Sequence, residues 1–172
     1  NRLVQSVFPV RRGVTAPSAN PVRVSDFDNV LEKEPNDVWS TSTHNAEHET
    51  VPVAFNGLIE KLGDNDYFKF KAKKGQALLF NCYSRRIRSK LDTAIYLYDA
   101  KGKYLTGRTD SGGADANFTY TIKADGYYNV RIIDELGNFG PDSAYRIEVT
   151  EIKPGVSVYL PDTARYDTQT RK

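Results

Sequence analysis

The acidic segment Glu32–Asp37 carries the residue types best suited to holding a metal ion. Four oxygen-bearing side chains (Glu32, Glu34, Asn36 and Asp37) fall within six residues, and Pro35 stiffens the chain between them. A second segment, Gly63–Tyr67, adds the carboxylates of Asp64 and Asp66. Calcium takes about six to eight oxygen ligands, so two acidic loops that meet in space could supply a calcium site. The alternative is that these are ordinary linker and turn residues, because Asp, Asn and Gly favour turns.

Two histidines offer a second, weaker metal hypothesis. His44 and His48 are four residues apart, and Glu47 stands beside His48. The order H-N-A-E-H differs from the metalloprotease motif H-E-x-x-H, in which the glutamate serves as general base. The pattern therefore favours two solvated loop histidines over a zinc site.

A basic cluster, Arg85, Arg86, Arg88 and Lys90, follows a predicted strand. It could bind phosphate, sulfate or an acidic glycan, or it could be a solvated loop. We favour the solvated loop and expect replacement of the three arginines by serine to change stability by less than about 1 kcal/mol.

The residues that commonly catalyse reactions do not form a catalytic pattern in this sequence. No serine lies in a G-x-S-x-G motif, and Gly112-Gly113 lacks the lysine of a phosphate-binding loop. Cys82 lies within a predicted strand, where a small core residue is expected rather than a nucleophile. We therefore expect no enzyme.

Alternation of apolar and polar residues predicts the fold. It runs through Asp66–Ala72, Phe118–Ile122 and Tyr145–Thr150, and a period of two indicates half-buried strands. More uniformly apolar runs at 76–83, 93–98 and 127–133 suit central strands. Glycines at 75, 102 and 126 mark turns between strands. The pattern predicts an all-β, antiparallel β-sandwich, with one or two helical turns after Asn36 or Asp37.

Length and charge limit the organisation and the partners. The 172 residues suit one folded unit, expected at 32–152, between the tail of a preceding β domain and linker at 1–31 and an extension at 153–172 with one more strand at Val156–Leu160. The 24 basic and 22 acidic side chains argue against a nucleic-acid binder. No apolar run approaches the roughly 18–20 residues that a membrane span needs, and the single cysteine cannot form an internal disulfide.

Several short motifs, in order along Glu32 to about Thr150, carry a family resemblance. They are E-P-N-D, N-G-L-I-E, G-D-N-D-Y-F-K-F, K-K-G-Q, L-D-T-A-I-Y-L-Y-D-A-K-G, A-D-G-Y-Y-N-V-R-I and Y-R-I-E-V-T. Together they resemble the bacterial pre-peptidase C-terminal domain family, which includes the collagen-binding domains of clostridial collagenases. The strand leading into E-P-N-D is also similar to planctomycete-type multidomain proteins.

The resemblance implies a jelly-roll-like β-sandwich attached to secreted peptidases or large surface proteins, with calcium bound through the acidic linker. Carried over by position, the implied metal ligands are the side chains of Glu32, Glu34, Asn36, Asp37, Asp64 and Asp66 and backbone carbonyls of Gly57 and Tyr67. Leu58 stands where a hydroxyl residue is usual, and Gly63 where an extra acid can occur. These two departures weaken or remove one of the family's two calcium positions.

We therefore expect a non-catalytic, calcium-binding accessory module of a larger secreted, periplasmic or cell-surface protein, with neighbouring domains as its partners. The alternative is a module that binds a polysaccharide or a fibrous protein. Its surface would be formed by tyrosines that could equally fill the core: Tyr96, Tyr98, Tyr104, Tyr127 and Tyr128.

Overall fold

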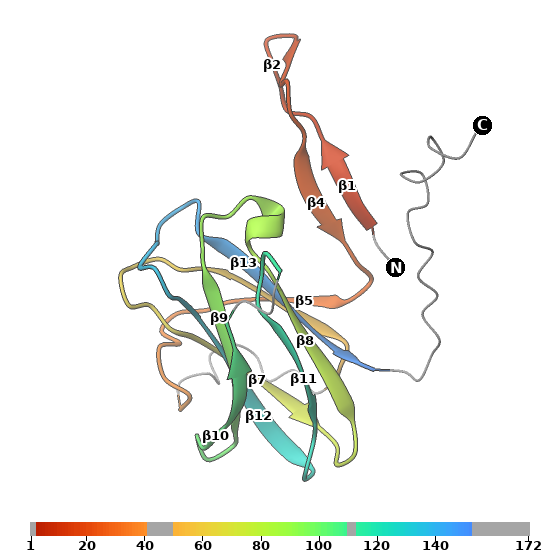
Figure 1. The fold of residues 1–172 in the computed structure, drawn as a ribbon, viewed down its shortest axis with the longest axis vertical. Helices are drawn as coiled ribbons and strands as arrows, with labels where there is room; N and C mark the ends of the chain where they lie inside the picture. Colours follow the sequence, from red (N-terminus) through yellow and green to blue (C-terminus); the bar gives the residue numbers. More distant parts are fainter. Residues whose placement is uncertain (1–2, 41–49, 110–112, 153–172) are drawn as a thin grey trace, which may run out of the picture.

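Two β-sheets pack face to face in the computed structural model, which describes residues 3–40, 50–109 and 113–152 (Figure 1). The four-stranded sheet has the order β10-β9-β12-β7 and the five-stranded sheet the order β11-β8-β13-β6-β5. The strands of the first sheet are β7 (Asp66–Ala72), β9 (Thr93–Asp99), β10 (Tyr104–Arg108) and β12 (Gly126–Asp134). Those of the second are β5 (Asp28–Leu31), β6 (Val53–Leu58), β8 (Ala77–Tyr83), β11 (Asn117–Thr121) and β13 (Ala144–Glu151).

Aromatic side chains from the inner faces of both sheets form the core. Phe55 of β6 stacks on Phe68 of β7 with 4.7 Å between ring centroids, and Phe70 meets Phe80 at 5.9 Å. All four rings are fully buried. Alternation predicted this face for Phe68 and Phe70, and the predicted all-β, antiparallel sandwich is confirmed.

The sandwich begins earlier than residue 32. Strand β5 pairs in parallel with β6, from Asp28 opposite Val53 to Leu31 opposite Asn56, and Val30 packs against the core. Strand β5 therefore belongs to the sandwich and not, as expected, to the segment before it. Its partner β6 follows a proline and a polar stretch, so the local pattern gave no sign of this pairing.

An arm precedes β5 and projects away from the sandwich (Figure 1). Its two-stranded ribbon consists of β1 (Leu3–Val7) paired antiparallel with β4 (Asn20–Val24). The tip carries β2 (Val10–Arg11) and β3 (Val14–Thr15). The strand expected at Val156–Leu160 and the histidines His44 and His48 lie outside the described residues.

The helix expected after Asn36 or Asp37 is not formed in the described stretch to Ser40. Instead the Asn36 carbonyl accepts a hydrogen bond from the backbone amide of Tyr67 in β7 at 3.1 Å, so it does not serve as the acceptor of a first helical turn. The only helix within the described ranges is the short 3-10 turn η2 (Arg85–Ile87). No helix there is long and apolar enough to cross a membrane.

Candidate metal centre

Three carboxylates converge where the acidic linker crosses the start of β7. Glu32 directly follows β5, Glu34 lies two residues on, and Asp66 is the first residue of β7. One carboxylate oxygen from each lies within 4.8 Å of the others. Asp66 is fully buried, while the two glutamates are half-buried. The linker and the second acidic segment therefore meet in space at these three residues.

Tyr145 and Gly57 shape this space. The Tyr145 hydroxyl of β13 lies 2.6 Å from Asp66 Oδ2 and 3.0 Å from Glu32 Oε2. Gly57 stands opposite Tyr145 in the neighbouring strand β6. A Cβ atom on Gly57 would lie 2.1 Å from Glu32 Oε2 and 2.3 Å from the Tyr145 hydroxyl, so only glycine leaves room for both groups.

Tyr145 was not among the predicted site residues, because its place in an alternating strand indicated an ordinary core position. The available signal was its register. A large polar-tipped residue opposite a glycine on an adjacent strand has space over that glycine for its hydroxyl. That pairing depends on contacts between strands far apart in the sequence.

Burial makes the charged form of these carboxylates unfavourable. It raises the pKa of Asp66 to about 9, with the nearby Glu32 carboxylate adding to the effect and the Tyr145 hydrogen bond opposing it. Burial also raises the pKa of Glu32 and of Glu34. Burial and the two adjacent carboxyl groups together raise the pKa of Tyr145 well above its usual value. Negative charge in this space therefore requires a proton or a cation for compensation.

Asp64 lies beside the cluster and is almost completely buried. Its Oδ2 accepts a hydrogen bond from the Glu60 amide at 2.6 Å, whereas its buried Oδ1 has no hydrogen-bond partner. The Lys61 ammonium lies 3.6 Å from Oδ1 and 2.9 Å from Asp37 Oδ2. The hydrogen bond from Lys61 lowers the pKa of Asp37, so this carboxylate stays ionised and its charge is compensated by the Lys61 ammonium.

The remaining predicted ligands flank the cluster. Asn36 is fully buried, and its backbone amide donates a hydrogen bond to Glu34 Oε2 at 2.8 Å. The Tyr67 ring lies against Tyr98, with 5.8 Å between centroids, and its backbone amide donates to the Asn36 carbonyl. Gly57 contributes to the site by leaving space for the Glu32 carboxylate and the Tyr145 hydroxyl.

The donor set fits a hard divalent cation. Every candidate ligand is an oxygen, and three carboxylates are close enough to share one ion. The buried Oδ1 of Asp64, beside them, accepts no hydrogen bond from the described residues. Calcium and magnesium both take such ligands, and calcium accepts the larger and less regular set.

Other candidates for chemistry have structural partners. Cys82 is fully buried, and burial raises the pKa of its thiol to about 12, so it is neither accessible nor ionised at neutral pH. The arginine cluster is exposed, as expected for a solvated loop, but two of its members have acidic partners. Arg86 Nε lies 2.6 Å from an oxygen of the buried Asp115 side chain, and Arg85 pairs with Asp92 at 2.9 Å. The sequence could not show that Asp115 lies beneath this loop.

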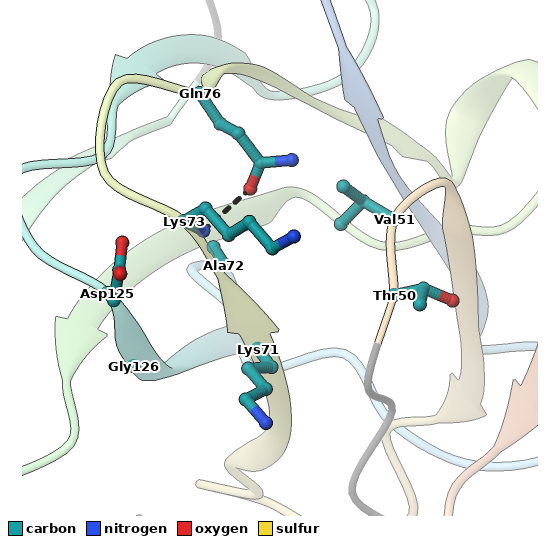
Figure 2. Close-up of a pocket in the computed structure, with 8 residues that line it drawn as sticks. All are labelled: Thr50, Val51, Lys71, Ala72, Lys73, Gln76, Asp125 and Gly126. Atoms are coloured by element: carbon teal, nitrogen blue, oxygen red, sulfur yellow. Dashed lines mark hydrogen bonds between the residues drawn. The ribbon is translucent and has the colours of Figure 1, made fainter.

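A cavity of about 280 Å³ lies at the opposite end of β7 from the metal centre (Figure 2). Its polar groups are engaged in the turns that form it. Gln76 Oε1 accepts the Lys73 amide at 2.7 Å, and Asp125 Oδ1 accepts the Lys74 amide at 2.6 Å. These groups hold the sandwich end together, so the cavity is not the candidate functional site.

Comparisons with known proteins agree with a module of a longer chain. No protein-family model matches the chain. It is 30% identical over 114 residues to a probable subtilase-type serine protease of Deinococcus radiodurans, covering 62% of this chain and 15% of that protein. The chain thus spans about 15% of the length of the curated relative.

Solved structures with a similar arrangement include the pre-peptidase C-terminal domain of a Bacillus anthracis collagenase. It is 11% identical with a TM-score of 0.49, covering 69% of this chain and 100% of that one. The Aeromonas hydrophila PliG protein, a periplasmic inhibitor of g-type lysozyme, is 14% identical with a TM-score of 0.43, covering 62% and 100%.

Proposed function

We propose that this chain is a non-catalytic, calcium-binding accessory module of a larger exported or cell-surface protein. One observation carries the proposal: Glu32, Glu34 and Asp66 bring carboxylate oxygens within 4.8 Å of one another in a space that Gly57 keeps open. Asp64, Asn36 and backbone carbonyls near Gly57 and Tyr67 would complete an oxygen coordination shell. The ion would replace protons as the charge that compensates the buried carboxylates.

The proposed role is positional. Glu32, Glu34, Asn36 and Asp37 follow the edge strand β5, whereas Asp64 lies just before β7 and Asp66 begins it. An ion held by both segments would fasten the chain after β5 to β7, and so help to hold the edge strand through which the preceding arm joins the sandwich. The similarity to a small part of a much longer protease-type relative supports an accessory role, in the manner of pre-peptidase C-terminal modules of secreted, periplasmic or surface proteins.

Thermal unfolding in calcium and in excess chelator tests this function. A ligand that binds only the folded state stabilises it by about 2.7 kcal/mol at a hundredfold excess over Kd, so calcium should raise the unfolding midpoint. Asp66→Asn should reduce that rise, while Asp125→Asn, at the other end of β7, should leave it unchanged. Identical wild-type curves with calcium and chelator would refute the proposal.

A second role, attachment to a polymer, is favoured by a different observation. Of the five tyrosines considered in the sequence, only Tyr128 is buried with its ring against the core aromatic Phe70. The other four lie on the opposite, outward side of the same sheet.

A further inference from the structure

The outer face of the sheet β10-β9-β12-β7 carries a connected group of tyrosines. Tyr67 contacts Tyr98 with 5.8 Å between centroids, Tyr98 contacts Tyr104 at 5.9 Å, and Tyr104 contacts Tyr96 at 6.4 Å. These four residues, here called the tyrosine platform, come from three different strands. Tyr104 is 53% exposed and Tyr96 and Tyr98 are half-buried, so these three rings are accessible, whereas Tyr67 is only 9% exposed and supports Tyr98.

The platform is held in place before any ligand arrives. Arg131 of β12 lies among the rings, with its guanidinium carbon 5.8 Å from the Tyr67 centroid and 5.5 Å from that of Tyr96. Its Nε donates to Asn65 Oδ1 at 2.9 Å and its Nη1 to the Tyr98 hydroxyl at 3.2 Å. Rings that are already ordered lose little conformational freedom on binding.

A glycine gives one ring its position. Gly107 of β10 faces Tyr96 of β9, and a Cβ atom on it would lie 2.3 Å from Tyr96 Cδ1. The Tyr96 ring therefore lies across the strand at Gly107. The result is a wide aromatic surface of the kind on which apolar ring faces pack.

The charged side chains at the outward strand positions of this face are cations, although burial and the nearby Glu135 carboxylate, just after β12, together raise the pKa of Tyr96. The outward positions of β7, β9 and β12 include three cations, Lys69, Lys71 and Arg131, and no carboxylate. The Lys69 ammonium lies 4.6 Å and the Lys71 ammonium 5.7 Å from the ring centroid of Tyr127, a fifth tyrosine on the same side. This local excess contrasts with the near balance of the whole chain, at 24 basic and 22 acidic residues.

We propose that this face binds an acidic polysaccharide, with sugar rings on the tyrosine platform and their anionic groups toward Arg131, Lys69 and Lys71. Tyrosines supply ring faces and hydroxyl groups for sugars, and the cations supply the charge preference. The chain as a whole, with 24 basic and 22 acidic residues, lacks the basic excess of a nucleic-acid binder, which favours a polysaccharide. The proposal rests on the accessory role proposed above but not on the metal.

Binding of the full 172-residue chain to immobilised polymers tests the proposal. The probes are polygalacturonate and dextran sulfate, which distinguish carboxylate from sulfate groups, with neutral dextran, polyglutamate and a single-stranded DNA oligonucleotide for comparison. We expect at least one acidic polysaccharide to bind tenfold or more tightly than the three comparison polymers. Equal binding to dextran or polyglutamate, tighter binding to DNA, or no binding to either acidic polysaccharide would overturn it.

Variants locate the binding surface. Tyr104→Ala and the double change Lys69→Gln with Lys71→Gln should each weaken binding to the preferred polysaccharide at least fivefold. The matched controls on the distant arm, Phe8→Ala and Arg11→Gln with Arg12→Gln, should stay within twofold. Equal weakening by the arm variants would place the binding surface elsewhere and refute the proposal.

Calcium titration of the same variants separates the two proposals. Tyr104, Lys69 and Lys71 contribute no candidate metal ligand, so their variants should retain wild-type calcium binding and unfolding midpoints. Polysaccharide binding without calcium binding would refute only the metal, and the converse would refute only the polysaccharide surface.

Discussion

At the scale of single residues, the candidate metal centre is defined by one hydroxyl between two carboxyl groups. The Tyr145 hydroxyl has one proton, yet its oxygen is within hydrogen-bonding distance of both Asp66 and Glu32. The second contact requires a proton on one of the carboxyl groups, in keeping with the pKa of about 9 for Asp66. A cation that displaced this proton would bind both carboxylates, with the hydroxyl left to donate to one of them.

Asp66 should matter more than Glu32 for calcium binding. Asp66 is fully buried as the first residue of β7, whereas Glu32 is half-buried and already accepts a hydrogen bond from the Leu58 amide at 2.6 Å, so its charge depends less on a bound ion. We predict that Asp66→Asn, which keeps the volume but removes the charge, weakens calcium binding by at least tenfold and leaves the metal-free module folded. Glu32→Gln should have a smaller effect. Isothermal titration calorimetry of both variants measures the order, and wild-type affinity in Asp66→Asn would show that its carboxylate serves only the turn.

At the scale of elements, alternation predicted strands well because each strand has one face toward a common core. The range Asp66–Ala72 coincides with β7, and Gln76–Tyr83 differs from β8 by one residue. Gly75 and Gly102, predicted to form turns, adopt φ angles of 89° and 78°. These features depend on residues close together in the sequence.

Features that depend on distant partners were not predictable in the same way. Strand β5 is defined by its parallel pairing with β6, and the buried partner of Arg86 is Asp115, 29 residues later. The candidate metal ligands were found because acidic residues at such density are unusual on any element. Tyr145 was missed because a tyrosine in an alternating strand is an ordinary core residue and gives no sign of a site.

In the loop that contains η2, Arg86 should contribute more to stability than Arg88, because only Arg86 has a buried acidic partner. Arg86 binds the buried Asp115 side chain and lies 4.0 Å from the Tyr83 ring centroid, whereas exposed Arg88 reaches Asn20 at 3.1 Å. We predict that Arg86→Ser lowers the free energy of unfolding by about 2 kcal/mol, because Asp115 loses a charged partner. Arg88→Ser should change it by less than about 1 kcal/mol. Urea denaturation measures both, and equal effects would contradict this assignment.

Acid should weaken the same loop. Burial alone would raise the pKa of Asp115, but hydrogen bonds from Arg86, Ser84 and the Arg85 amide outweigh it and leave this pKa below its usual value. A lowered folded-state pKa gives stability that is present above the unfolded value of about 3.9 and is lost as the pH falls through the folded value.

The corresponding prediction compares wild type with Asp115→Asn across pH. The wild type should be more stable by about 2 kcal/mol at pH 7, and this difference should shrink steadily below pH 4. Urea denaturation at pH 7, 5, 4 and 3 gives the difference directly. A constant difference over this range would mean that the charge of Asp115 contributes nothing.

At the scale of the whole molecule, the arm is joined to the sandwich by a buried charge network. Arg23 of β4 donates two hydrogen bonds of 2.9 Å to the Glu148 carboxylate of β13, and Arg146 donates a third. Arg146 also binds Ser25 and Asn29, in the chain between the arm and β5 and in β5 itself. The arm is therefore attached to the sheet whose strand β6 contains Gly57, so its direction is fixed relative to the metal centre.

Loss of Arg23 should release the arm without unfolding the sandwich. The Arg23 side chain is only 12% exposed and its partner Glu148 4%, so Arg23→Gln removes a desolvated ion pair, although Arg146 still holds Glu148. We expect a decrease of about 2 kcal/mol in the free energy of unfolding. We also expect faster hydrogen exchange in β1 and β4, while the amides of β7, β9 and β12 keep their protection because they belong to the other sheet. Arg11→Gln at the exposed arm tip is the matched control. If β1 and β4 exchanged at the wild-type rate in Arg23→Gln, the arm would be held by backbone pairing alone, and the ion pair would have no part in setting its direction.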